Sequence, residues 1–100
     1  MIIKRGQYKI VRPDGSEEMV DKKPTLEALY EAIGCDCVDI VRVGSRDSQQ
    51  VMIVDDNGLL NNLPINDKAT ALYWQFYNTT SPIVGTVVLA NDADFGDEDE

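Results

Sequence analysis

The stretch VMIVDDNGLLNNLPIND, residues 51–67, decides the fold because a strand, a turn and a helix start follow one another within it. Residues 51–54 form a short apolar run, which is typical of a buried strand. The Asp-Asp-Asn-Gly sequence that follows is typical of a sharp turn. Asn66 is of a residue type that caps helix N-termini. We therefore expect a buried strand here, followed by a short ordered connector and a helix.

Further short segments predict the other strands. Residues 38–43 read VDIVRV and residues 83–89 read IVGTVVL, and both are rich in β-branched residues. Residues 2–12 and 17–20 flank the sequence Pro-Asp-Gly-Ser, in which proline presets φ and glycine accepts a positive φ. These two segments therefore predict a hairpin. Gly85 lies inside the last predicted strand and indicates a bulge or a close approach of another backbone segment.

Two helices are predicted from apolar residues that recur every three or four positions. The first follows Thr25, a predicted N-cap, and ends at Gly34, which suits the left-handed conformation at a helix C-terminus. The apolar stripes are Leu26, Leu29, Tyr30 and Ile33 in the first helix, and Ile65, Ala69, Leu72, Tyr73 and Phe76 in the second. The element order β-β-α-β-β-α-β predicts an α+β fold, with a single mixed or antiparallel sheet and both helices packed on one face of it.

The acidic residues are concentrated at the C-terminal end of the chain. There are 18 acidic and 9 basic residues, which gives a net charge of −9. Six of the acidic residues follow Ala90, so the rest of the chain has 12 acidic against 9 basic residues and is only mildly acidic. We expect one domain at residues 1–90 and a flexible acidic tail at residues 91–100. The tail either keeps the protein soluble or docks on a basic partner, with Phe95 as an apolar anchor.

Nothing in the sequence predicts export or membrane insertion. No apolar run approaches the roughly 20 residues that a membrane-spanning helix needs, and the residues after Met1 lack the apolar core of a signal peptide. Cys35 and Cys37 are only two residues apart, which is poor geometry for a disulfide. We therefore expect a cytoplasmic protein with reduced thiols.

The residue types also predict a protein without catalytic activity. The chain contains no histidine, which is the commonest general base and the usual partner of a serine or cysteine nucleophile. Asp55 and Asp56 fall in the predicted turn, where aspartate is expected for structural reasons. No glycine-rich phosphate loop is present, and Cys35 and Cys37 lack the further ligands of a zinc site. We expect no enzyme activity, no cofactor, no metal site and no direct binding to nucleic acid.

Two groups of residues are candidates for binding a partner. The basic candidates are Arg5, Arg12, Arg42 and Arg46, and the aromatic candidates are Tyr73 and Trp74. If the fold brings the arginines together, they could contact the phosphate of a small ligand; otherwise they are scattered, solvated charges. Trp74 lies beside the apolar stripe of the second helix. It is either half-buried or an exposed anchor for a partner, since tryptophan is enriched in interface hot spots.

Several of these segments, taken in order, resemble one protein family. They are the helix that ends at Gly34, the strand VDIVRV, the strand and turn VMIVDDNG, the helix start LPIN at residues 63–66, and the final IVGTVVL. Over about residues 25–90 the chain is similar to the domain-of-unknown-function family DUF3846, found in phages and bacteria. Gly85 matches the pattern of that family. The resemblance implies an arginine directly after LPIN, a position that Asp67 occupies in this chain.

The resemblance implies a setting rather than a mechanism. Small phage-type proteins without catalytic residues commonly act by binding a component of the host. We therefore expect a non-enzymatic protein in the host cytoplasm that binds and inhibits or redirects a host protein, in particular a defence protein. The alternative is that it sequesters a small nucleotide-like signalling ligand, with the arginines on the phosphate and Tyr73 or Trp74 stacked on the base. A short edge strand or the Trp74 side of the helix could also join copies into a homo-oligomer.

Overall fold

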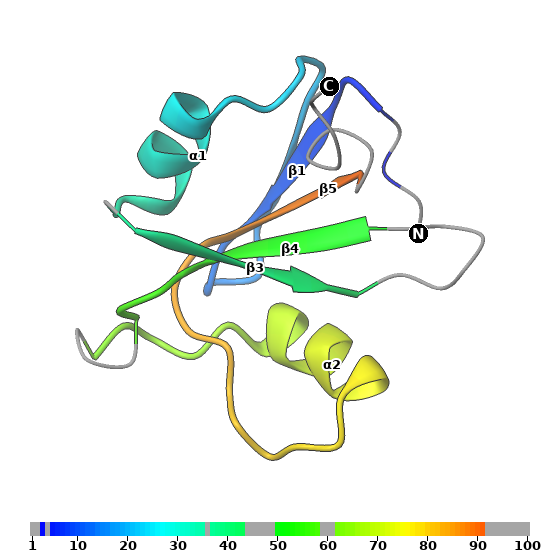
Figure 1. Cartoon of the computed structure of the whole chain (residues 1–100). Helices are drawn as coiled ribbons and strands as arrows, with labels where there is room; N and C mark the ends of the chain where they lie inside the picture. Colours follow the sequence, from blue (N-terminus) through cyan, green and yellow to red (C-terminus); the bar gives the residue numbers. More distant parts are fainter. Residues whose placement is uncertain (1–2, 4, 36, 44–49, 59–61, 92–100) are drawn as a thin grey trace.

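The protein folds into a five-stranded antiparallel sheet with one helix on each face (Figure 1). The computed structural model describes residues 3, 5–35, 37–43, 50–58 and 62–91. In chain order the elements are β1 (Tyr8–Val11), β2 (Glu17–Val20), α1 (Leu26–Ile33), β3 (Val38–Arg42), β4 (Gln50–Asp55), α2 (Asp67–Phe76) and β5 (Val87–Asn91). This order and the α+β class confirm the sequence prediction.

The strands are arranged β2-β1-β5-β4-β3, so the last strand of the chain lies in the middle of the sheet. Every neighbouring pair is antiparallel. The two central strands, β4 and β5, are apolar at consecutive positions and are almost entirely buried. The edges are formed by the more polar strands β2 and β3, which reduces the tendency of the sheet to pair with another chain.

The two helices lie on opposite faces of the sheet, so the prediction that both pack on one face is wrong (Figure 1). Neighbouring residues of a strand point to opposite faces. The core under α1 contains Tyr8, Ile10, Leu29, Ile33, Val51, Ile53, Val88 and Ala90. The core under α2 contains Ile3, Val11, Val43, Met52, Ala69, Ile83, Val87 and Leu89. A central strand that is apolar at every position must be covered on both sides, and this requires one helix for each face.

The first hairpin forms as the residues at its turn predict. The amide of Gly15 donates to the carbonyl of Arg12 at 2.9 Å, and Gly15 has a φ of +93°. The Asp14 carboxylate accepts a hydrogen bond from the amide of Ser16 at 2.8 Å, which lowers the pKa of Asp14. The turn therefore depends on a glycine that tolerates positive φ and on an aspartate that bonds to its own backbone.

Both helices begin at the predicted caps and α1 ends at the predicted Gly34, whereas α2 ends at Phe76 with Tyr77 as its C-cap. The Thr25 hydroxyl accepts a hydrogen bond from the amide of Ala28 at 3.1 Å, and Gly34 ends α1 with a φ of +80°. The Asn66 side chain accepts a hydrogen bond from the amide of Ala69 at 3.1 Å at the start of α2. The ends of the predicted apolar stripes do not reach the core: Leu26, Ile65 and Phe76 are exposed.

The last strand begins later than predicted. Residues 83–85 precede β5, and Val84 forms an isolated bridge with Ile65 rather than a strand of the sheet. Gly85 has a φ of +78°, and a Cβ atom there would lie 2.8 Å from Cδ1 of Leu63, which confirms a close approach at this glycine. At the other end, Asn91 belongs to β5 and its amide group donates to the carbonyl of Ile3 at 3.0 Å. Asn91, which the sequence analysis assigned to the tail, therefore belongs to the sheet, and the rest of the predicted tail, residues 92–100, lies outside the described residues.

Candidate functional site

A largely apolar groove of about 320 Å³ lies between α2 and the half of the sheet formed by β1, β2 and β5. We call it the Lys68 groove. Its lining consists of Val11, Glu17, Val87 and Leu89 from the strands and Lys68, Ala69, Ala71, Leu72 and Gln75 from α2. The floor is apolar because the strand residues that face α2 are valine and leucine. Its size is in the range of pockets that bind small molecules.

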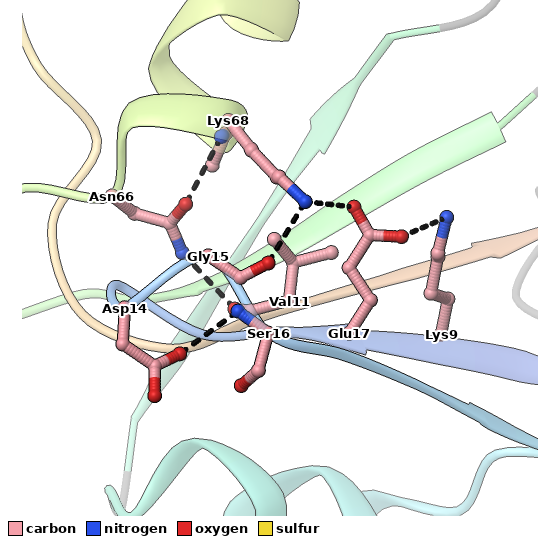
Figure 2. Close-up of polar contacts among 9 residues, drawn as sticks. Lys9, Val11, Asp14, Gly15, Ser16, Glu17, Asn66 and Lys68 are labelled. Atoms are coloured by element: carbon pink, nitrogen blue, oxygen red, sulfur yellow. Dashed lines mark hydrogen bonds and ion pairs between the residues drawn. The ribbon is translucent and has the colours of Figure 1, made fainter.

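Glu17 joins two lysines at the rim of the Lys68 groove (Figure 2). Its carboxylate is 2.7 Å from the Lys9 ammonium and 2.9 Å from the Lys68 ammonium, and Lys68 also donates to the carbonyl of Gly15 at 2.8 Å. Hydrogen bonds from Lys9 and then Lys68 lower the pKa of Glu17 from 4.5 to about 2. Glu17 therefore stays ionised and fixes Lys68 against the hairpin that ends in β2.

Asn66 connects the start of α2 to two distant parts of the chain. Its side-chain amide donates to the carbonyl of Val11 at 3.0 Å (Figure 2) and to that of Gly85 at 2.9 Å, while its side-chain oxygen caps α2. The backbone amide of Asn66 also donates to the carbonyl of Ile83 at 2.8 Å. Asn66 is 0% exposed, so these bonds replace water completely. They fix the position of α2 relative to β1 and to the segment that leads into β5.

Among the described residues, the predicted arginines do not form one basic pocket. In the register of the sheet, Arg42 of β3 lies opposite Val51 of β4. Val51 lies opposite Ala90 of β5, and Ala90 lies opposite Tyr8 of β1. Arg12 follows Val11, at the end of β1 opposite Tyr8. Three strand spacings across the sheet and four residues along β1 therefore separate Arg12 from Arg42, a distance of roughly 20 Å. Arg12 is also bound to Glu18, with 2.6 Å between the guanidinium and the carboxylate.

Of the other two predicted arginines, only Arg5 lies among the described residues. Arg5 is exposed on the segment that leads into β1. Arg46 lies outside the described residues. The cations that the structure does bring together are Lys9 and Lys68, which share the carboxylate of Glu17.

The two predicted aromatic residues face different surroundings. Tyr73 packs against the core under α2, and its ring stacks on Tyr77 with 4.8 Å between the ring centroids. Trp74, the next residue of α2, is 48% exposed, and its indole N–H donates to the carbonyl of Ser81 at 2.9 Å. Trp74 is thus half-buried and at the same time open to a partner.

A second groove, of about 460 Å³, lies on the outer side of α2, and we call it the Trp74 groove. It is lined by Ile65, Asp67, Thr70, Ala71, Trp74, Thr80 and Pro82. Its loop wall is held to the helix, since Thr70 both donates to the carbonyl of Ile83 at 3.2 Å and accepts from its amide at 2.9 Å. The Trp74–Ser81 bond holds the same wall at a second point. The groove is therefore built in advance of any partner.

The comparison with protein families agrees with the resemblance found in the sequence. The family model described as Domain of unknown function (DUF3846) matches residues 8–100. The chain belongs to the DUF3846 family. The match extends beyond residues 25–90 and includes the first hairpin. No curated protein and no solved structure matches the chain.

In this DUF3846 protein, Asp67 stands where the resemblance implies an arginine. It is the first residue of α2 and lines the Trp74 groove, so the departure places a negative charge at that groove.

Within the described ranges no three His, Cys, Asp or Glu side chains are arranged to hold a metal ion. Both helices that the structure describes are too short and too polar to cross a bilayer. Cys35 and Cys37 are not joined by a disulfide, and the Cys35 thiol donates to the carbonyl of Cys37 at 3.3 Å.

Sequence reasoning missed Glu17 and Lys68 as members of one site. Their side chains meet although the residues lie 51 positions apart in the chain. A lone Glu on a strand and a lone Lys on a helix give no local signal, because such residues are normally solvated. Asn66 was predicted as a cap from its local sequence, whereas its bonds to Val11 and Gly85 depend on the tertiary fold.

Proposed function

We propose that this DUF3846 protein acts without catalysis, by binding another protein on the outer side of α2 and thereby inhibiting or redirecting it. The occurrence of the family in phages and bacteria makes a host protein, in particular a defence protein, the target that we propose. The observation that carries the proposal is the half-exposed Trp74 in a groove with the exposed Ile65.

The composition of the Trp74 groove supports a protein partner. Trp74 and Ile65 leave 48% and 54% of their surfaces exposed, although both are large and apolar. Tryptophan concentrates binding energy at protein interfaces because it combines a large apolar surface with few rotatable bonds. The wall formed by residues 80–83 is already bonded to Thr70 and Trp74, so a partner would lose little entropy in ordering it.

The pKa shifts of Asp14 and Glu17 argue against these two carboxyl groups as general acids. The pKa values of Asp14 and Glu17 are both shifted downward by hydrogen bonds to their ionised forms. A general acid at neutral pH needs the opposite shift, since it must hold its proton until the reaction requires it. The chain also contains no histidine that could take this role.

Capture of partners from a host lysate tests the proposal. The W74A variant should lose the partner that the wild-type chain retains, because truncation of a central aromatic anchor commonly costs over 2 kcal/mol of binding, more than tenfold in affinity. L26A is the matched control, since Leu26 is an equally exposed apolar residue on α1, on the other face of the sheet. A chain ending at Asn91 separates the contribution of the acidic tail. Capture that survives W74A, or that is lost equally in L26A, would refute the proposal.

The Lys68 groove favours a second candidate, in which the protein sequesters a small ligand. The groove has an apolar floor, and the Lys68 ammonium lies at its rim. A ligand with one apolar group and one phosphate, as in a nucleotide, would fit this groove. The apolar group would lie on the floor and the phosphate would contact the Lys68 ammonium. Calorimetry with a panel of nucleotides tests it: heat of binding that disappears in K68A supports the candidate, and absence of heat with every nucleotide removes it.

A further inference from the structure

A smaller, acidic pocket adjoins the Trp74 groove. Pro82 lines both of them, and the residues next to Pro82 form the wall of the second. The second pocket has a volume of about 150 Å³, and its lining consists of Asp39, Val54, Asp55, Asp56, Pro82, Ile83 and Val84. The bridge between Ile65 and Val84 fixes the two linings side by side. A partner segment that enters the Trp74 groove therefore passes close to the acidic pocket.

The linings of the acidic pocket and the Trp74 groove together carry an excess of negative charge. They contain four carboxylates, on Asp39, Asp55, Asp56 and Asp67, and within the described residues neither lining includes a lysine or an arginine. The lysine closest in sequence is Lys68, but its ammonium is bound to Glu17 and Gly15 at the Lys68 groove. The joined surface is thus an apolar groove between acidic residues.

We infer that the partner of the Trp74 groove is a basic protein segment, which inserts an apolar side chain beside Trp74 and places flanking Arg or Lys residues near Asp56 and Asp67. This inference rests on the proposed function and names the chemistry of the partner. Opposite charges around an apolar anchor select a partner and accelerate its association. An arginine beside Trp74 would gain a further attraction to the face of the indole ring.

The same charges disfavour the other occupants of such a groove. A second copy of this chain would bring its own acidic body, since acidic residues outnumber basic ones even without the tail. An anionic lipid surface and a free nucleotide would both be repelled by Asp56 and Asp67. The nucleotide and the anionic lipid surface each predict a different outcome in the experiment below.

Synthetic peptides titrated into the full chain test the inference, with the fluorescence of Trp74 as the readout. Trp74 is the single tryptophan of the chain, so its emission reports on the groove itself. The peptides share a Leu-Leu anchor and carry flanking arginines, glutamines or glutamates. We expect the arginine peptide to bind about tenfold more tightly than the glutamate peptide, and the difference to shrink in high salt.

Two double variants separate a local charge effect from a general one. D56N/D67N removes one carboxylate from each lining, and neither carboxylate is a capping group in the structure. The control variant E27Q/E31Q also removes two carboxylates, but from the exposed side of α1, on the other face of the sheet. Glu27 is a matched residue for Asp67, since each is the acidic residue in the first turn of its helix. We expect D56N/D67N to weaken the arginine peptide about fivefold and E27Q/E31Q to leave it nearly unchanged.

Equal binding of the three peptides, equal effects of the two double variants, or no binding of any peptide would overturn the inference. Tighter binding of nucleotides or of anionic vesicles than of the arginine peptide would overturn it as well. The proposed function fails separately, when capture of a host protein does not depend on Trp74. If W74A abolishes capture but the peptides show no preference for charge, the binding role stands and only the basic nature of the partner is wrong.

Discussion

Replacement of Asn66 by alanine should lower the free energy of unfolding by about 3 kcal/mol. The variant removes the N-cap of α2, which contributes about 1 kcal/mol. It also leaves the carbonyls of Val11 and Gly85 without the amide that bonds to them at 3.0 and 2.9 Å in a fully buried position, at a cost of about 1 kcal/mol or more each. Such a loss is a large share of the roughly 5–15 kcal/mol that a domain of this size has in total.

Urea unfolding followed by circular dichroism measures this loss, and T25A provides the matched control. Thr25 caps α1 through a single bond to the amide of Ala28 at 3.1 Å, so T25A removes a cap and nothing else. We expect T25A to cost about 1 kcal/mol. The difference between N66A and T25A then isolates the two buried carbonyl bonds. Because both variants unfold the same chain, their m-values should agree.

N66D sharpens the same test. The carboxylate would retain the cap but would face the two buried carbonyl oxygens, so at pH 7 N66D should be less stable than N66A. Burial among acceptors raises the pKa of the introduced carboxyl, so N66D should regain stability as the pH falls from 7 toward about 3.9, the usual pKa of aspartate. If N66A costs no more than T25A, or if N66D is as stable as wild type at neutral pH, Asn66 does not join α2 to the sheet as we describe.

Three further variants address the groove rim, the close approach at Gly85 and the edge of the sheet. E17Q should cost about 1 kcal/mol at pH 7, well below what the full pKa shift implies, because 32% of the Glu17 side chain is exposed. Since the folded pKa of Glu17 is lowered from 4.5 to about 2, the advantage of wild type over E17Q should disappear as the pH falls through this window in urea titrations. G85A should cost about 2 kcal/mol and G15A about 1 kcal/mol in thermal unfolding, because both have a positive φ but only Gly85 lies against another side chain. Y77F should cost about 0.5–1 kcal/mol in urea unfolding, since the Tyr77 hydroxyl donates to the outward carbonyl of Arg42 at 2.7 Å.

The elements of this fold could be predicted because their signals are local. The turn at Pro13–Ser16 and the caps at Thr25 and Asn66 depend on residues within three positions of one another. Gly34 and Gly85 were predicted from the need for unusual backbone geometry, and both have a positive φ. Signals between residues so close in sequence leave few alternative positions for the turns and caps. The order of strands and helices could therefore be predicted from them.

The placement of the two helices on one face was predicted wrongly, although the sequence of the central strands indicates that both faces are covered. Two helices on one face would leave the other face of β4 and β5 in water. Residues 51–54 and 87–90 are apolar at consecutive positions, which is typical of strands that are buried on both faces. The position of β5 between β1 and β4 has no comparable signal, because it depends on pairing between segments far apart in the chain.

The candidate site was predictable only in its aromatic part. Trp74 was singled out by residue type and by its position beside the apolar stripe, and the structure places it in a groove. The arginines were grouped on the assumption that β1 and β3 lie close together. The sheet order instead places β5 and β4 between these strands, and Arg12 and Arg42 stand at opposite ends of the register.

The contrast between the two helices bears on the binding surface that we propose. The exposed side of α1 carries Glu27 and Glu31, the charged residues expected on a solvated helix. The outer side of α2 carries Trp74, which leaves 48% of its surface in water. Truncation of exposed residues usually changes folding stability by no more than about 0.5 kcal/mol. Apart from the bond of its indole to Ser81, the exposed half of Trp74 therefore adds little to folding, which supports the partner site that we propose.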